Sequence, residues 1–235
     1  MERPTAVVTG GTGGLGRAVI RRLADRGFRI AATYLVPDEA ESLESEVRVP
    51  EDGLLLRRVD CTDPAAVGAF MDEVAERYGP FNVLAALVGG WSGGKDVAET
   101  DDVRFDRMID LNLRTSFNAA RAALPHMRRA DWGRIVMVGS RAAIEPASGQ
   151  AMYNAAKAGV IALARTIAQE VAEMGITSNV VLPSVVDTPT FRRSVPYADY
   201  VDWPTPEEIA AVIDFLASPD SGVVNGAMIP VYGTS

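Results

Sequence analysis

Short runs of apolar, often β-branched residues alternate along the chain with longer stretches in which apolar residues recur every three or four positions. Several short runs are apolar at consecutive positions, which is typical of strands buried on both faces of a parallel sheet. The longer stretches have the period of amphipathic helices. We predict strands at 5–10, 28–34, 54–60, 82–90, 134–140, 177–183 and 227–233, and helices at 14–27, 63–79, 101–129, 152–174 and 205–218.

Capping residues support several of these helix ends. Asp63 is a suitable N-cap and is followed by proline at the first helical position. Thr205 and Glu208 have the spacing of a capping box. Residues 101–129 are expected to form one long helix or two abutting helices, and Pro125 is expected to bend or restart the helix, because proline interrupts the helical hydrogen bonds.

The repeated order of strand, helix and strand predicts an α/β fold, with parallel strands and crossover helices on both faces of the sheet. No repeat, low-complexity segment or linker divides the chain, so we expect residues 1–235 to form a single domain. The least regular stretch is 184–204, which is rich in proline and aromatic residues. Long loops in compact domains are often functional, and we interpret this one as a lid over a substrate.

Composition and charge narrow the possible functions. The net charge of -8 argues against binding to nucleic acid or to an anionic membrane, both of which need basic patches. Cys61 is the only cysteine, so no intrachain disulfide can form. No signal peptide and no apolar run of the ~18 residues that span a membrane is found. We therefore expect a soluble cytoplasmic protein.

Metal chemistry is not expected. No group of His, Cys and Asp has the spacing of metal ligands. We interpret the single histidine, His126, as a residue on a helix surface rather than a catalytic group.

A glycine-rich stretch, TGGTGGLG at 9–16, joins the first predicted strand to the first helix. Gly10, Gly14 and Gly16 allow a tight turn and a close approach of a pyrophosphate, and the helix N-terminus presents free N–H groups and partial positive charge. Glycine-rich turns alone are weak evidence, but this one has the strand–turn–helix context that dinucleotide binding requires.

The spacing T-G-x-x-x-G-x-G, together with DLN at 110–112, VGS at 138–140 and YNAAK at 153–157, resembles the short-chain dehydrogenases/reductases over nearly the whole chain. The resemblance implies a Rossmann-type, doubly wound sheet of about seven strands in the order 3-2-1-4-5-6-7. It also implies an NAD(P)-dependent oxidoreductase that reduces a carbonyl or oxidises an alcohol.

The candidate catalytic residues are Asn112, Ser140, Tyr153 and Lys157. Tyr153 and Lys157 share a helix face, and a nearby positive charge lowers the pKa of a phenol. We expect Tyr153 to transfer the proton, Ser140 to hydrogen-bond the carbonyl oxygen, and Lys157 to lower the pKa of Tyr153 and bind the nicotinamide ribose. By resemblance, Asn112 would anchor a water that links Lys157 to solvent. The alternative is a non-catalytic module that senses NAD(P), for which a broken Ser–Tyr–Lys set would be expected.

The resemblance also implies a set of cofactor-binding residues, which includes Tyr153 and Lys157. The others are Gly10, Thr12, Gly14, Leu15, Gly16, Tyr34, Asp60, Cys61, Val88, Gly89, Gly90, Pro183, Val186 and Thr188.

The chain departs from the family pattern at three places. Ala86 and Leu87 replace asparagines, and Ser184 replaces a glycine. Tyr34 stands where an acidic residue would select NAD, while Gly13 and Leu35 stand where basic residues would select NADP. The sequence leaves NAD and NADP as alternative cofactors, with a slight preference for NADPH because no acidic residue would repel its phosphate. Asp38 could reach back to the ribose, but we interpret it as a solvated acid.

Trp91, Arg141, Met152 and Ser184 are the expected substrate contacts. Arg141 suggests an anionic substrate, although a solvated surface arginine is as good an interpretation. Two kinds of activity are alternatives: that of a 3-oxoacyl thioester reductase and that of a pterin or quinone reductase. The stretch VGGW at 88–91 is a weak indication of a pterin reductase. Alanine-rich helices predict a homo-oligomer, a tetramer or a dimer.

Overall fold

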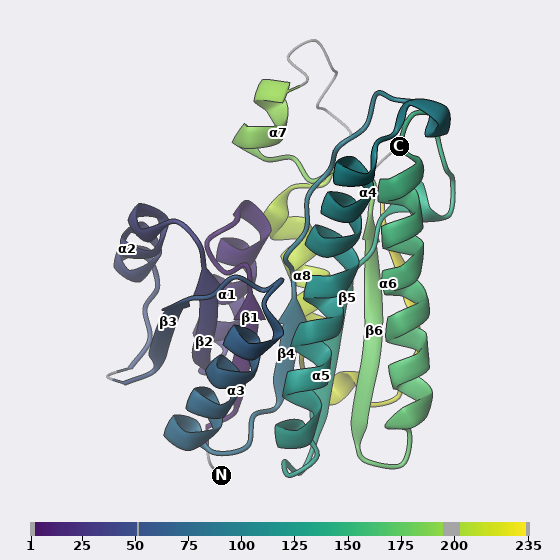
Figure 1. Cartoon of the computed structure of the whole chain (residues 1–235). Helices are drawn as coiled ribbons and strands as arrows, with labels where there is room; N and C mark the ends of the chain where they lie inside the picture. Colours follow the sequence, from purple (N-terminus) through teal and green to yellow (C-terminus); the bar gives the residue numbers. More distant parts are fainter. Residues whose placement is uncertain (1–2, 51, 195–202, 234–235) are drawn as a thin grey trace.

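The computed structural model describes residues 3–50, 52–194 and 203–233. Within them, seven parallel strands form one sheet in the order β3-β2-β1-β4-β5-β6-β7 (Figure 1). The strands are β1 (Thr5–Thr9), β2 (Arg29–Tyr34), β3 (Leu54–Arg58), β4 (Val83–Ala86), β5 (Gly133–Val138), β6 (Ile176–Pro183) and β7 (Met228–Val231). The predicted fold class and strand order are confirmed.

Helices cover both faces of this sheet. The helices of the described residues are α1 (Gly14–Asp25), α2 (Pro37–Glu46), α3 (Pro64–Tyr78), α4 (Asp102–Met108), a π-helical segment η2 (Ile109–Arg114), α5 (Thr115–Met127), α6 (Ala151–Glu170), α7 (Pro189–Ser194) and α8 (Pro206–Leu216), of which α7 lies beyond the end of the sheet. Three short 3₁₀ turns, η1 (Val97–Glu99), η3 (Arg141–Ala143) and η4 (Pro219–Ser221), lie between them. Figure 1 shows α3, α5 and α6 on the near face and α1 and α8 behind the sheet.

The two faces of the sheet carry separate hydrophobic cores. Val7 and Leu84 belong to the core beneath α3, α5 and α6, whereas their neighbours Ala6 and Val83 belong to the core beneath α1 and α8. Successive side chains of a strand point to opposite faces, so a strand covered on both sides must be apolar at every position. This explains the consecutive apolar runs in the sequence.

Some helix predictions need correction. The stretch at 101–129, predicted as one helix or two abutting helices, contains α4, η2 and α5 in direct succession, and no helix restarts at Pro125. Pro125 lies in the last turn of α5, where the helix ends two residues later, and the irregularity occurs instead in η2. Helix α2 was not predicted, because its sequence is mostly acidic and only Ala40 and Leu43 are buried.

The lid prediction for 184–204 falls partly on residues 195–202, which lie outside the described part of the chain. The described part of that segment contains the short helix α7. Within the described residues, no helix has the length and apolar character needed to cross a membrane.

Candidate active site

The glycine-rich turn links the carboxyl end of β1 to the start of α1. Gly10 has a φ of 72°, a left-handed conformation that favours glycine. A Cβ on Gly16 would lie only 2.2 Å from the Gly10 carbonyl oxygen. Gly13 is the N-cap and provides no side-chain cap, so the first amides of α1 stay available to an anion. A Cβ on Gly14 would lie 2.8 Å from the Thr188 side-chain methyl, so a larger residue at this position would require the Thr188 side chain to move.

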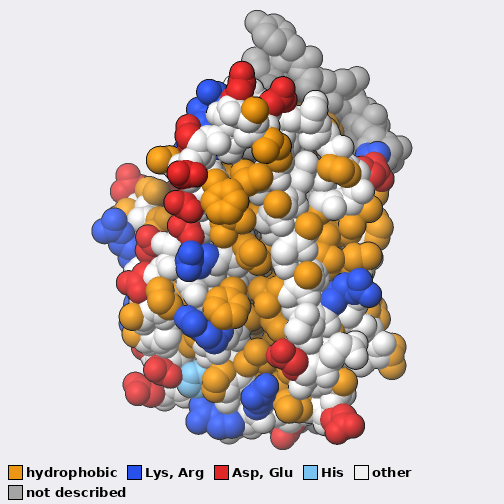
Figure 2. Space-filling view, turned by 45° about the vertical axis from the view of Figure 1, so that its right-hand side comes forward, with side chains coloured by type: hydrophobic (Ala, Val, Ile, Leu, Met, Phe, Trp, Pro, Cys, Tyr) orange, Lys and Arg blue, Asp and Glu red, His pale blue; other side chains and the backbone are white. Residues whose placement is uncertain are grey.

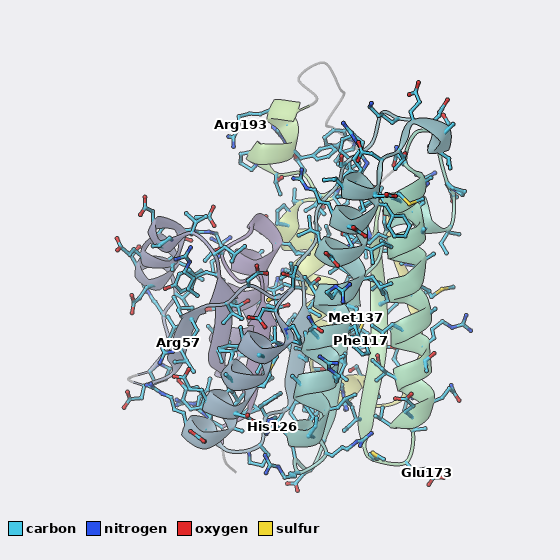
Figure 3. The ribbon with its side chains drawn as sticks, in the orientation of Figure 1. Arg57, Phe117, His126, Met137, Glu173 and Arg193 are labelled. Carbon is cyan, nitrogen blue, oxygen red and sulfur yellow. The ribbon has the colours of Figure 1, made fainter. Side chains whose placement is uncertain are left out.

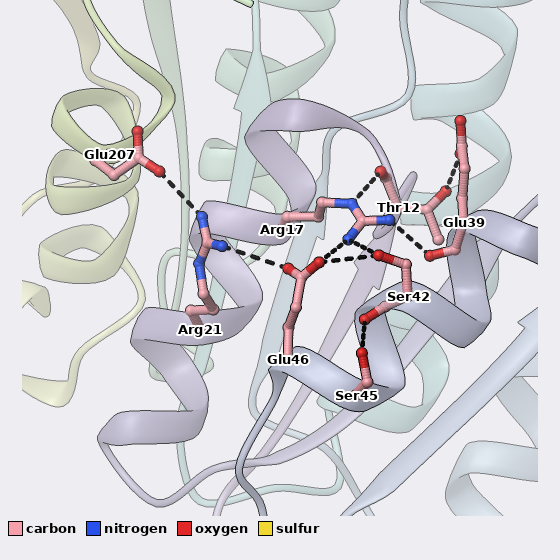
Figure 4. Close-up of polar contacts among 8 residues, drawn as sticks. All are labelled: Thr12, Arg17, Arg21, Glu39, Ser42, Ser45, Glu46 and Glu207. Carbon is pink, nitrogen blue, oxygen red and sulfur yellow. Dashed lines mark hydrogen bonds and ion pairs between the residues drawn. The ribbon is translucent and has the colours of Figure 1, made fainter.

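The turn is bonded to the end of β2. The Gly10 amide donates to Thr33 Oγ1 at 3.0 Å and the Gly11 amide donates to the Thr33 carbonyl at 2.9 Å. Thr12 is buried, and its hydroxyl donates to Glu39 Oε2 at 2.9 Å (Figure 4). Glu39 is a residue that the sequence interpretation did not include, since it comes from the unpredicted helix α2. The neighbouring Asp38 was considered instead.

Asp60 and Cys61 follow β3 and lie beside this turn. The Asp60 carboxylate accepts hydrogen bonds from the hydroxyl and the amide of Thr62, and these bonds lower its pKa. The Cys61 thiol is buried against Thr33 Oγ1 at 3.6 Å. Asn118 donates to the carbonyls of Cys61 and Thr62 and holds the segment in place. Asn118 was also missed, because nothing in the local sequence distinguishes it from an ordinary helix residue.

Val88, Gly89 and Gly90 follow β4 and meet η2. Asn112 is wholly buried, accepts a hydrogen bond from the Gly90 amide at 3.1 Å, and donates to the Gly90 carbonyl at 3.0 Å. A Cβ on Gly89 would lie 2.9 Å from Asn112 Oδ1 and 3.1 Å from Lys157 Nζ. The Asn112 side chain therefore positions the glycines, and its predicted role as a water anchor stays a prediction.

Ser140, Tyr153 and Lys157 converge at the carboxyl end of β5. Ser140 lies just beyond this strand and is 3% exposed, and its hydroxyl contacts the Tyr153 phenol. Lys157 comes from the same face of α6 and donates to the Val138 carbonyl at 2.9 Å, with its Nζ 6.0 Å from the Tyr153 ring centroid. Residues far apart in the sequence are thus combined into one buried polar cluster.

Burial controls the protonation of this cluster. It lowers the pKa of Lys157 from 10.5 to about 8. It raises the pKa of Tyr153, and the hydrogen bond with Ser140 offsets this only in part. Desolvation of the phenolate therefore outweighs the other influences on the pKa of Tyr153, and the expectation that Lys157 lowers this pKa stays a prediction.

The predicted substrate residues lie around the same end of the sheet. Trp91 is 46% exposed and donates to Gln150 Oε1, and its ring packs edge-on against Phe191 with centroids 6.2 Å apart. Phe191 in turn packs against Trp203, with centroids 5.5 Å apart. Met152 is half-buried at the start of α6. The described parts of the predicted lid therefore contribute two aromatic rings beside Trp91.

Arg141 and Ser184 already have partners within the protein. Arg141 Nε lies 2.7 Å from a Glu145 carboxylate oxygen, and its guanidinium lies 5.0 Å from the Tyr232 ring centroid. The Ser184 hydroxyl donates to the Tyr232 carbonyl at 2.8 Å. These contacts favour a structural role for Ser184, and the anion-binding role of Arg141 stays a prediction.

The remaining predicted cofactor residues flank the turn. Leu15 is half-buried in the first turn of α1 and Tyr34 is half-buried at the end of β2. Pro183 ends β6, Val186 packs against the core beneath α1 and α8, and Thr188 Oγ1 accepts from the Phe191 amide.

His126 lies away from this cluster, in the last turn of α5 (Figure 3). Its ring packs against Phe81, with centroids 5.7 Å apart, and its Nε2 is 3.0 Å from an Asp72 oxygen. These contacts agree with the structural interpretation of this histidine. Among the described residues, no group of three or more His, Cys, Asp or Glu side chains could hold a metal ion.

Comparison with known proteins agrees with this geometry. The family model described as short chain dehydrogenase matches residues 4–197. The 3-oxoacyl-[acyl-carrier-protein] reductase MabA of Mycobacterium tuberculosis is 33% identical over 237 residues, covering 97% of this chain and 91% of the relative. The D-beta-hydroxybutyrate dehydrogenase of Rhizobium meliloti is 35% identical over 197 residues, covering 82% and 75%.

A solved structure has the same architecture. The NADPH-bound short chain oxidoreductase of Pseudomonas aeruginosa, described as containing an atypical catalytic center, superposes with a TM-score of 0.91 at 28% identity, covering 100% of this chain and 98% of that one. Together, the match of the family model over most of the chain and these relatives show that the chain belongs to the short-chain dehydrogenase family.

Proposed function

We propose that this protein reduces a carbonyl to an alcohol, or catalyses the reverse reaction, with NAD(P)(H) as cofactor and Tyr153 as proton donor and acceptor. The observation that carries the proposal is the convergence of Ser140, Tyr153 and Lys157 beside Gly89 and the glycine-rich turn. When bound, the nicotinamide would supply or accept the hydride. The intact Ser–Tyr–Lys set argues against the non-catalytic sensing module.

The phenol of Tyr153 has the protonation state that carbonyl reduction needs. Its raised pKa keeps the hydroxyl protonated at neutral pH, so it can donate a proton to an alkoxide oxygen. The Ser140 hydroxyl would hydrogen-bond the same oxygen and stabilise its developing charge. The Lys157 ammonium, charged below about pH 8, would stabilise the phenolate left after transfer.

The relatives favour one of the substrate classes left open by the sequence. One relative is named as a reductase of a 3-oxoacyl substrate and another as a dehydrogenase of a 3-hydroxy acid, so both names describe interconversion of a carbonyl and an alcohol at the third carbon of an acyl chain. We therefore propose a 3-oxoacyl thioester as the substrate class. The pterin or quinone alternative rests only on the sequence around Trp91.

The experiment is a steady-state assay of the purified protein with NADH or NADPH and an acetoacetyl thioester, a quinone and a dihydropterin. Tyr153→Phe should lower kcat at least about a hundredfold while dissociation constants for the dinucleotide change little, because only the proton donor is removed. Tyr78→Phe is the matched control, since that phenol donates to the Asp52 carbonyl far from the cluster. Equal activity of Tyr153→Phe and the wild type would contradict the proposal.

We also propose a homo-oligomer that associates through the face of α4 and α5. Val103, Phe105 and Phe117 are exposed there by 76%, 46% and 43%. Figure 2, in which the α6 side of the molecule comes forward, shows hydrophobic side chains gathered over a broad area. Contiguous exposed apolar surface of this kind is typical of protein–protein contacts. A dimer or tetramer in the cytoplasm is the assembly that we expect.

A further inference from the structure

The contact between the glycine-rich turn and α2 indicates which dinucleotide the protein selects. Glu39 Oε2 accepts the hydrogen bond of Thr12 Oγ1 at 2.9 Å, which places a carboxylate at the junction of β1, α1 and β2 (Figure 4). We propose that Glu39 binds the hydroxyls of the adenosine ribose and makes the protein prefer NAD(H) to NADP(H). The inference rests on the dinucleotide-dependent function proposed above.

The position of this carboxylate matches the place where a ribose is bound in doubly wound folds. In such folds an acidic residue near the end of the second strand hydrogen-bonds the ribose 2′-hydroxyl. Here Tyr34 ends β2 and Leu35 follows it, so the strand itself supplies no acid. The first turn of α2 supplies one instead, because Glu39 reaches across to the turn that Thr33 holds against β2.

Arg17 fixes α2 in this position. Its guanidinium donates to the Thr12 carbonyl at 3.0 Å and to the Glu39 carbonyl at 2.7 Å, so it joins the two segments that carry the contact. Its charge is paired with Glu46, at 2.7 Å, with a further hydrogen bond to Ser42. Arg17 therefore holds the Glu39 backbone but is already paired with another carboxylate.

The two positions where the family pattern would place a basic residue for a 2′-phosphate carry no positive charge. Gly13 has no side chain and Leu35 is an exposed apolar residue, although these are the positions where a basic residue would serve. Among the described residues, the polar contact of the Glu39 side chain is with the Thr12 hydroxyl. The preference for NADPH suggested by the sequence depended on the absence of a nearby acid, and this contact removes that argument.

The two cofactors differ at the atom that this carboxylate would contact. Ribose hydroxyls donate hydrogen bonds to a carboxylate, whereas a 2′-phosphate brings up to two negative charges against it. Even with the dielectric constant of water, repulsion of one or two negative charges by the carboxylate at about 4 Å gives roughly five- to thirtyfold weaker binding, and the lower dielectric near a protein surface increases this. We therefore expect NADH to bind at least about tenfold more tightly than NADPH.

The test measures dissociation constants of NADH and NADPH by isothermal titration calorimetry, so that it does not depend on the substrate. Glu39→Gln keeps the shape of the side chain and removes its charge. This variant should bind NADPH about tenfold more tightly than the wild type, with a change of at most a few fold for NADH. Glu41→Gln is the matched control, because it removes the same charge from the exposed surface of the same helix. It should leave the NADH to NADPH ratio unchanged.

Three results would overturn the inference. The first is a wild type that binds NADPH as tightly as NADH, and the second is an unchanged ratio in Glu39→Gln. The third is an equal change in Glu41→Gln, which would show a general charge effect. If the wild type bound neither dinucleotide, the proposed function would fall together with the inference, so the two failures are distinguishable. Thermal unfolding of each variant checks that it is folded.

Discussion

Replacing Lys157 with methionine should stabilise the folded protein at neutral pH even though it removes a proposed catalytic group. The Lys157 side chain is 5% exposed, and burial lowers its pKa from 10.5 to about 8. That change corresponds to about 3 kcal/mol by which the folded state disfavours the ammonium. The hydrogen bond from Lys157 to the Val138 carbonyl stabilises the folded state by about 1.5 kcal/mol and offsets part of this desolvation cost. Lys157→Met should therefore raise the free energy of unfolding by about 1 to 2 kcal/mol near pH 7.

The difference in stability between Lys157→Met and the wild type should decrease as the pH rises. Below about pH 8 the lysine is charged in both states, so the folded protein carries the whole desolvation cost. Between pH 8 and 10.5 the unfolded chain binds one more proton than the folded protein, so the stability of the wild type rises with pH. The stability of the methionine variant relative to the wild type should therefore fall by about 2.5 kcal/mol between pH 7 and pH 10, so that the variant becomes the less stable of the two at pH 10.

Urea denaturation at these two pH values, together with steady-state kinetics, measures both consequences. Lys95→Met is the matched control, since it removes the other lysine of the chain from an exposed position. The control should show no comparable change with pH. If Lys157→Met were less stable than the wild type at pH 7, or if the difference were the same at both pH values, the argument from desolvation would be refuted.

Two further predictions concern the turn and the assembly. A Cβ at Gly16 would lie 2.2 Å from the Gly10 oxygen, so Gly16→Ala should weaken dinucleotide binding at least about tenfold in calorimetry. Its control, Gly68→Ala in α3, meets nothing within 4 Å and should add about 0.5 to 1 kcal/mol of stability. Phe105→Glu should convert the oligomer to monomers in sedimentation velocity, because it places a charge on an apolar contact face. A monomeric wild type at micromolar concentration would contradict the proposed assembly.

The sequence alone was sufficient for the features that depend on local periodicity. Consecutive apolar residues identified strands covered on both faces, and the i, i+4 spacing placed Tyr153 and Lys157 on one face of α6. The glycines of the turn were recognisable because their backbone requirements are local. Helix α2 was missed because a prediction from local periodicity needs an apolar face, and only two residues of this helix are buried.

The tertiary structure alone decided which side chains meet and how deeply they are buried. Thr12 and Glu39 are joined by the packing of α2 against the turn, which no spacing in the sequence indicates. The raised pKa of Tyr153 follows from desolvation, which outweighs the charge effect that the Tyr–Lys spacing suggested. Solvent exclusion and contacts between distant segments arise from the whole fold, whereas periodicity and turn chemistry are properties of neighbouring residues.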